Sequence, residues 1–126
     1  MRRLHAEERR ARLLLRHRLA PAARATGPVE ATRAVVALHS TDAATVFLST
    51  WARTRDFAPE HLERALYEER ALVRMLGMRR TLWVVPEELA PVVDAACTRA
   101  VAARERRRLE QLVGQSSVAE DPSAWI

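Results

Sequence analysis

The hydrophobic pattern of this chain switches from helical spacing to two short β-prone runs and then back to helical spacing. The β-prone runs cover residues 72–76 and 81–85, and only residues 77–80 separate them. Apolar runs joined by so short a connection predict a β-hairpin, which Pro86 would end. Three helical patterns precede the hairpin, at residues 28–38, 43–52 and 59–69. This is the element order of a winged helix-turn-helix, so we expect a mainly α fold with a small β-hairpin.

Local signals support the three helices of this unit. Pro28 and Pro59 each suit a first helical position, because the N–H that proline lacks would be unpaired there. Asp42 can accept a hydrogen bond from the free amides at the start of the middle helix. This cap leaves residues 39–41 as a short connection between the first two helices.

The same patterns divide the chain into four segments. We expect an N-terminal basic helix, a winged-helix unit, a long connecting helix that ends at Gly114, and the start of a truncated following segment. These cover residues 1–25, 26–86, 87–114 and 115–126. The length of 126 residues suits one domain. The last residues, 124–126, include an apolar pair without an evident partner, so we expect the chain to be a fragment.

Basic residues outnumber acidic ones, and they are unevenly placed. The chain has 21 basic residues, all of them Arg, against 16 acidic ones, which gives a net charge of +5. An excess of this sign favours a polyanion partner such as nucleic acid. The segment 59–70, where a winged helix would present its recognition helix, carries four Glu and two Arg. Because phosphates would repel that helix, we do not expect it to read the major groove.

The hairpin has the opposite charge. Arg74, Arg79 and Arg80 lie on or beside its turn, and residues 70–86 contain no acidic side chain. We therefore expect these three arginines, together with Arg33 and the N-terminal arginines, to contact the backbone of double-stranded DNA. The alternative is that they keep an exposed sheet edge from pairing with other strands.

The sequence also excludes several kinds of site and location. Cys97 is the single cysteine, so it cannot form an internal disulfide, and its context indicates a helix interior in a reducing compartment. The longest strongly apolar run near the N-terminus, residues 13–15, is too short for a signal peptide or a membrane span. We expect a cytoplasmic protein with no membrane partner. Four scattered histidines and three glycines predict no metal site and no small-molecule cofactor.

Three stretches of the chain resemble a known family. They are RLLLRHRLAP (12–21), VVALHSTDAATVFLSTWAR (35–53) and LERALYEERALVRMLGMRRTLWVVP (62–86). They are similar to the bacterial winged-helix DNA-binding family that includes the DNA glycosylases that excise bulky alkylated bases and unhook interstrand crosslinks. Members of that family are much longer and have tandem winged helices around a DNA channel. The resemblance therefore implies that this chain corresponds to the N-terminal portion of such a protein.

The resemblance also implies a site. In the family's glycosylases the catalytic motif is a Gln, an apolar residue and a second Gln or an Asp, just after the first helix of this unit. The matching positions are His39, Ser40 and Thr41. A motif of this kind places a water against the anomeric carbon of an extruded nucleotide. His39 could accept a hydrogen bond from that water with Thr41 as its partner, although Thr lacks the paired contacts of an amide or carboxylate.

The sequence supports three interpretations of function. The first is a DNA-binding winged-helix protein that holds the duplex backbone. The second is a DNA glycosylase-like base-excision enzyme, or an inactive descendant, in which His39 and Thr41 position water. The alternative for His39 is a helix-end histidine that satisfies terminal carbonyls. The third is an interaction module, in which the acidic helix meets a protein partner or the long helix docks on a second copy or on missing C-terminal units. The arginines within 99–108 are either a solvated helix surface or a further DNA contact.

Overall fold

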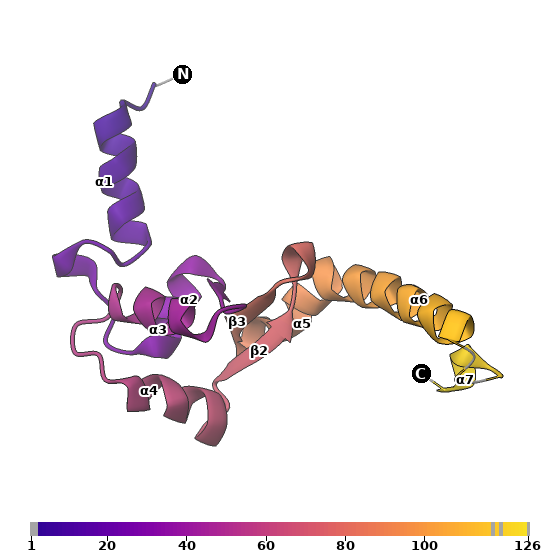
Figure 1. Ribbon diagram of the computed structural model, residues 1–126. Coiled ribbons are helices and arrows are strands. Elements are labelled where there is room, and N and C mark those ends of the chain that lie inside the picture. The colour runs from indigo at the N-terminus through magenta and orange to yellow at the C-terminus, as the bar shows by residue number, and fades with distance from the viewer. Residues whose placement is uncertain (1–2, 117, 119, 126) are drawn as a thin grey trace.

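The computed structural model describes residues 3–116, 118 and 120–125 of the chain. The described residues form helices around a small sheet, with one helix standing away from this body at the N-terminal end (Figure 1). The elements in chain order are α1 (Ala6–Arg16), α2 (Pro28–Val35), β1 (Leu38–His39), α3 (Ala43–Trp51), α4 (Pro59–Glu63), β2 (Leu72–Leu76), β3 (Leu82–Pro86), α5 (Ala90–Val93), α6 (Arg99–Ser116) and α7 (Pro122–Trp125). The predicted fold class is confirmed. The arrangement is that of a winged helix, with a preceding helix and a long helix after the hairpin.

The sheet has a third strand in addition to the predicted hairpin. β3 lies in the middle and pairs antiparallel with β2 on one side and with β1 on the other. Leu38 and Arg74 both lie opposite Val84, so these three side chains leave the same face of the sheet. His39 lies opposite Trp83, one position along, and both therefore leave the other face.

The prediction that the second helix extends to residue 38 was wrong. α2 ends at Val35, because Val36 adopts φ 71° and ψ −47°, a left-handed conformation that β-branched residues rarely take. This reversal directs the chain into β1, so His39 belongs to a strand and not to a connection. Backbone strain of this kind costs on the order of 1–3 kcal/mol and persists only where the surrounding structure fixes it.

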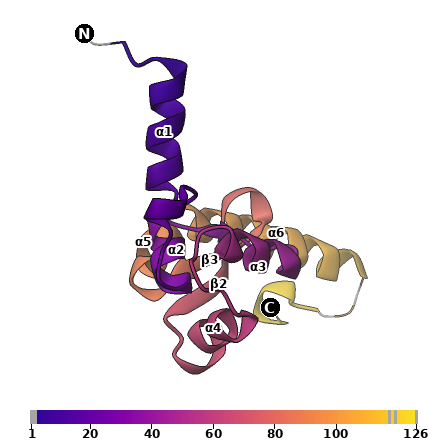
Figure 2. The ribbon, with the colours of Figure 1, turned by 90° about the vertical axis from the view of Figure 1, so that its left-hand side faces the viewer.

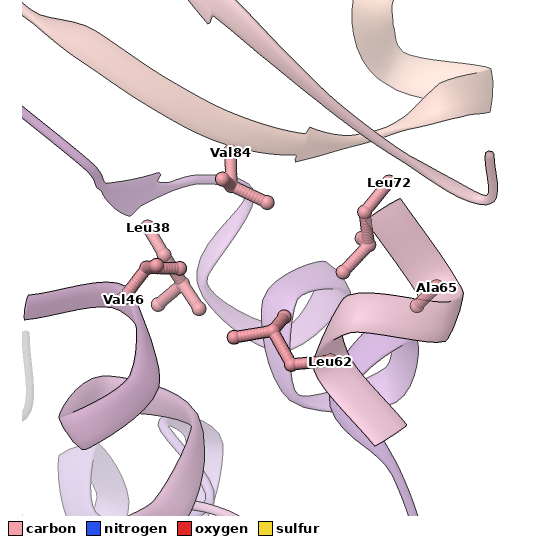
Figure 3. Close-up of a cluster of buried hydrophobic side chains, with 6 residues drawn as sticks. All are labelled: Leu38, Val46, Leu62, Ala65, Leu72 and Val84. Carbon is pink, nitrogen blue, oxygen red and sulfur yellow. The ribbon is translucent and has the colours of Figure 1, made fainter. Parts of the chain in front are cut away.

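The hydrophobic core lies between the sheet and the three helices of the winged-helix unit. Figure 3 shows its central side chains meeting from all three strands, from α3, and from α4 with the turn that continues it. Leu62, Leu72 and Val84 are each at most 1% exposed. The buried cluster is made of Leu38, Val46, Leu62, Ala65, Leu72 and Val84.

The predicted helix starts are confirmed. The Asp42 carboxylate accepts a hydrogen bond of 2.9 Å from the Ala44 N–H, and Pro28 and Pro59 open α2 and α4. Glu30 adds a cap that the sequence analysis missed. Its carboxylate accepts hydrogen bonds from the N–H and the hydroxyl of Thr26, and these hydrogen bonds lower the pKa of Glu30 from the usual value of a glutamate.

Two helical segments of the chain contain a π-helical turn, one after α4 and one in the long helix that follows β3. The turn Arg64–Glu68 continues α4, and the turn Asp94–Thr98 joins α5 to α6. The predicted long helix therefore exists, with an extra residue inserted near its start. Cys97 is half-buried within it, as expected, and its thiol donates to the Val93 carbonyl.

The predicted helix end at Gly114 was wrong. α6 continues through Gly114 to Ser116, while Ser117 of the predicted linker lies outside the described residues. α7 then folds back along α6, with Pro122 beside Gly114 and the Ser123 carbonyl accepting from Arg106. Residues 114–116 of the predicted linker are therefore helical, and α7 packs against this end of α6.

α1 and α6 both leave the body of the molecule (Figures 1 and 2). α1 buries none of its residues, and its leucines, among them Leu14 and Leu15, are about half exposed. Within the described part of the chain, no helix combines the length and the hydrophobicity needed to cross a membrane.

Candidate nucleic-acid interface

The tip of the hairpin is a compact turn that presents two arginines. Residues Met78–Arg80 form a 3-10 turn, in which Arg79 and Arg80 both have left-handed backbones, with φ of 57° and 62°. The Gly77 N–H donates to the Thr81 carbonyl, and the Thr81 hydroxyl donates to the Met78 carbonyl. Both arginine side chains are exposed.

Gly77 is required at the tip because an aromatic ring covers it. A Cβ added at this position would lie 2.8 Å from Cδ1 of Trp83. That distance is shorter than any normal contact between carbon atoms. The missing side chain therefore lets the Trp83 indole close over the start of the turn.

The tip does not project freely but is fixed to the long helix. The Thr98 hydroxyl donates a hydrogen bond of 2.6 Å to the Leu76 carbonyl at the end of β2. Further along the helix, the Arg80 guanidinium lies 2.8 Å from the Glu105 carboxylate. These two contacts hold the hairpin tip against the start and middle of α6.

This contact joins two arginine groups that are far apart in the sequence. Arg104 and Arg108 are four residues apart on α6, and helical rotation places both to the same side of Glu105, within about 100° of it. We call Arg79, Arg80, Arg104 and Arg108 the tip cluster. Within the described residues, Arg79, Arg104 and Arg108 form neither an ion pair nor a side-chain hydrogen bond. The cluster therefore offers guanidinium groups that have no acidic partner in the described structure.

The other two predicted DNA-binding arginines lie elsewhere. Arg74 extends from the core-facing side of β2 and donates a hydrogen bond of 2.8 Å to the Ser40 carbonyl. Arg33 lies 2.6 Å from Glu88, just beyond the end of β3 that is far from the tip. The hydrogen bond from its own amide, followed by the contact with Arg33, lowers the pKa of Glu88. The structure thus brings together two of the four predicted residues, Arg79 and Arg80.

His39 and Thr41 are close enough to interact. Nε2 of His39 is 3.3 Å from Oγ1 of Thr41, and the His39 ring meets Trp83 edge to face with centroids 5.2 Å apart. The Thr41 hydroxyl oxygen also accepts a hydrogen bond from the Leu82 N–H. Both side chains are therefore held by the central strand, and His39 keeps part of its surface exposed.

Sequence reasoning missed Trp83 and the position of Arg104 and Arg108. A glycine six residues before an aromatic residue, across a predicted hairpin turn, is a weak signal that the ring covers the turn. No sequence signal indicates which side of α6 meets the tip, because that depends on the π-helical turn at Asp94–Thr98.

We predict that Gly77→Ala destabilises the fold by about 1–3 kcal/mol, because the new methyl group displaces the Trp83 ring. Urea denaturation followed by tryptophan fluorescence measures this change. Gly114→Ala is the matched control. Its Cβ would lie 3.6 Å from Pro122, an ordinary contact, and alanine favours a helix interior, so stability should be kept or raised. A Gly77→Ala variant as stable as the wild type would contradict this role of Trp83.

Comparisons with known proteins agree with a role in DNA chemistry. Residues 32–124 match the family model described as DNA glycosylase AlkZ-like. Neither the search of curated proteins nor the search of solved structures found a match. The family match runs from within α2 through the sheet and the long helix into α7. The chain therefore belongs to the AlkZ-like DNA glycosylase family.

Proposed function

We propose that this chain binds the backbone of double-stranded DNA through the tip cluster. The observation that carries the proposal is the contact of the hairpin tip with the long helix, which brings Arg79 and Arg80 to the stretch of α6 that carries Arg104 and Arg108. Guanidinium groups form bidentate hydrogen bonds with phosphate oxygens, so two or three of them can hold adjacent phosphates. Membership of a DNA glycosylase family supports DNA as the partner.

Arg80 has a double role in this proposal. Its side chain is half exposed, and the Arg80–Glu105 pair is therefore worth little free energy in water. A DNA phosphate can replace Glu105 as the partner of Arg80 at small cost. In the absence of DNA, the same pair keeps the tip beside α6 and preorganises the cluster.

The acidic surface of α4 and its continuing turn lies outside this interface. Glu60, Glu63 and Glu68 are exposed there, and Arg64 is 3.9 Å from Glu68. The helix in the recognition position would therefore repel phosphates. Binding through the tip cluster avoids this repulsion, because the hairpin and α6 make the contact with DNA and α4 does not.

The salt dependence of duplex binding tests the proposal. If three arginines each neutralise one phosphate, log affinity should fall against log salt concentration with a slope of roughly −2.7. The triple variant Arg79→Ala, Arg104→Ala, Arg108→Ala should bind more weakly and with a slope closer to zero. Fluorescence anisotropy with a labelled duplex gives both values.

Arg33→Ala is the charge-matched control for the single variant Arg79→Ala. Arg33 is exposed and lies at the opposite end of the sheet, so removing it should change the affinity and the slope little. Wild-type binding with no salt dependence would exclude backbone contacts. An equal loss in the control and in a single Arg79→Ala variant would place the interface elsewhere.

A second candidate function is base excision, which the contact between His39 and Thr41 favours. The Thr41 hydroxyl oxygen accepts a hydrogen bond from the Leu82 N–H. Its second lone pair can accept another hydrogen bond from His39, provided that the His39 proton is on Nε2. In that tautomer Nδ1 carries a free lone pair and can accept a hydrogen bond from an attacking water. In the other tautomer Nε2 accepts from Thr41, and no acceptor is left for water. Catalysis therefore requires the proton on Nε2.

Release of damaged bases tests this second function. We expect the wild type to release N-alkylated purines from a duplex, and His39→Ala to lose that release by roughly 100-fold or more, as for removal of a general base. Arg33→Ala should leave it unchanged. Equal background release from the wild type and His39→Ala would exclude the enzymatic function and leave DNA binding alone.

A further inference from the structure

A groove runs between the end of the acidic helix and the start of β2, on the core-facing side of the sheet. Its volume is about 300 Å³, and its walls are Leu66, Tyr67, Arg70, Leu72, Val73 and Arg74. We call it the Tyr67 groove. A small cavity of about 40 Å³ adjoins it and shares Leu66, Tyr67 and Arg74 with it. Neither cavity includes a residue of the tip cluster.

The backbone on one side of the groove is irregular. Tyr67 lies in the π-helical turn Arg64–Glu68, and Arg70 then takes a left-handed conformation with φ 54° before the chain enters β2. The π turn and the reversal set Tyr67 and Arg70 beside the first residues of the strand. π-helical turns often occur at functional sites, because their extra residue redirects side chains.

An aromatic ring is exposed at the mouth of this groove. Tyr67 is 73% exposed, although tyrosine is usually at least half-buried. Most of the surface of this residue is therefore open to solvent. An exposed aromatic face beside two arginines is the combination with which proteins stack unpaired bases and hold their phosphates.

The small cavity that adjoins the groove holds a polar atom with no partner among the described residues. Ser40 is 1% exposed, it lines the small cavity, and its hydroxyl forms no hydrogen bond. A buried hydroxyl left unpaired destabilises the fold, so a ligand atom that forms a hydrogen bond with it removes that cost. Arg74 lies beside it, with one N–H on the Ser40 carbonyl and the others available.

We propose that the Tyr67 groove binds one unpaired nucleotide of a DNA strand. The base stacks on the Tyr67 ring, a polar edge of the base approaches the Ser40 hydroxyl, and the phosphate lies between Arg70 and Arg74. Arg70 forms no ion pair or side-chain hydrogen bond within the described residues, so its guanidinium is free for a phosphate. The groove opens on the opposite face of the sheet from His39 and Trp83, so this is a binding site separate from the second candidate function.

Binding of a short labelled single-stranded oligodeoxynucleotide to the full chain tests the proposal. Tyr67→Ala should weaken binding roughly 5- to 150-fold, which corresponds to the 1–3 kcal/mol that stacking of one base contributes. Tyr67→Phe keeps the ring and should bind within about twofold of the wild type. Trp51→Ala removes another exposed aromatic ring, outside the groove, and should change little.

Two further binding measurements identify the ligand and distinguish binding at the Tyr67 groove from binding at the tip cluster. A free deoxynucleoside monophosphate should bind more weakly than the strand, and equal affinity would mean that a free nucleotide is the ligand. The affinity for a fully paired duplex should be the same in Tyr67→Ala and in the wild type. This expectation holds whether or not the tip cluster binds DNA. Single-strand binding that is unchanged in Tyr67→Ala, or lost equally in Trp51→Ala, would overturn the proposal.

Discussion

The position of β3 in the middle of the sheet determines where each functional side chain of this molecule lies. Val84 points into the core between Leu38 and Arg74, and Trp83 points to the opposite face beside His39. A slip of β3 by one residue would turn its side chains to the other face and bury Trp83 in place of Val84. The buried contacts of Val84 make such a slip costly. The core therefore fixes the geometry of both candidate sites.

A second contact turns this scaffold into a possible DNA-binding surface. The hairpin tip is attached to the long helix by the Thr98 hydroxyl and by Arg80, and this attachment gathers arginines from two separate segments. A free hairpin tip would present two arginines on a flexible support. The attached tip presents four on a rigid one, and rigid placement reduces the entropy lost on binding. The acidic helix, in contrast, carries exposed glutamates at the usual recognition position, where they would repel phosphates.

Much of the fold could be predicted from local signals. The hairpin, the cap at Asp42 and the two prolines that open helices all act over a few residues, and the structure confirms them. The strand β1 could not be predicted, because two residues carry no alternation, and because Val36 takes a conformation that its side chain disfavours. The prediction at Gly114 was wrong for a different reason. A glycine is common just after the end of a helix, but here α6 continues through Gly114, where Pro122 of α7 packs against it.

The candidate sites were harder to predict than the fold. Net charge drew attention to the hairpin arginines, but it could not show that Arg33 and Arg74 have partners distant in the sequence, Glu88 and the Ser40 carbonyl. Such contacts join residues that are distant in the sequence, so local sequence patterns do not predict them. The same is true of Tyr67. The helical pattern of residues 59–69 groups it with the inward-facing Leu62 and Leu66, but it is 73% exposed, in the π-helical turn Arg64–Glu68.

Hydrogen exchange with and without a DNA duplex at low salt tests the central claim most directly. If the tip cluster holds the backbone, amides in residues 77–81 and 98–108 should be protected by DNA, while those in α2 and α4 should exchange as in the free protein. Protection centred on α4, with none at the hairpin tip, would contradict the account.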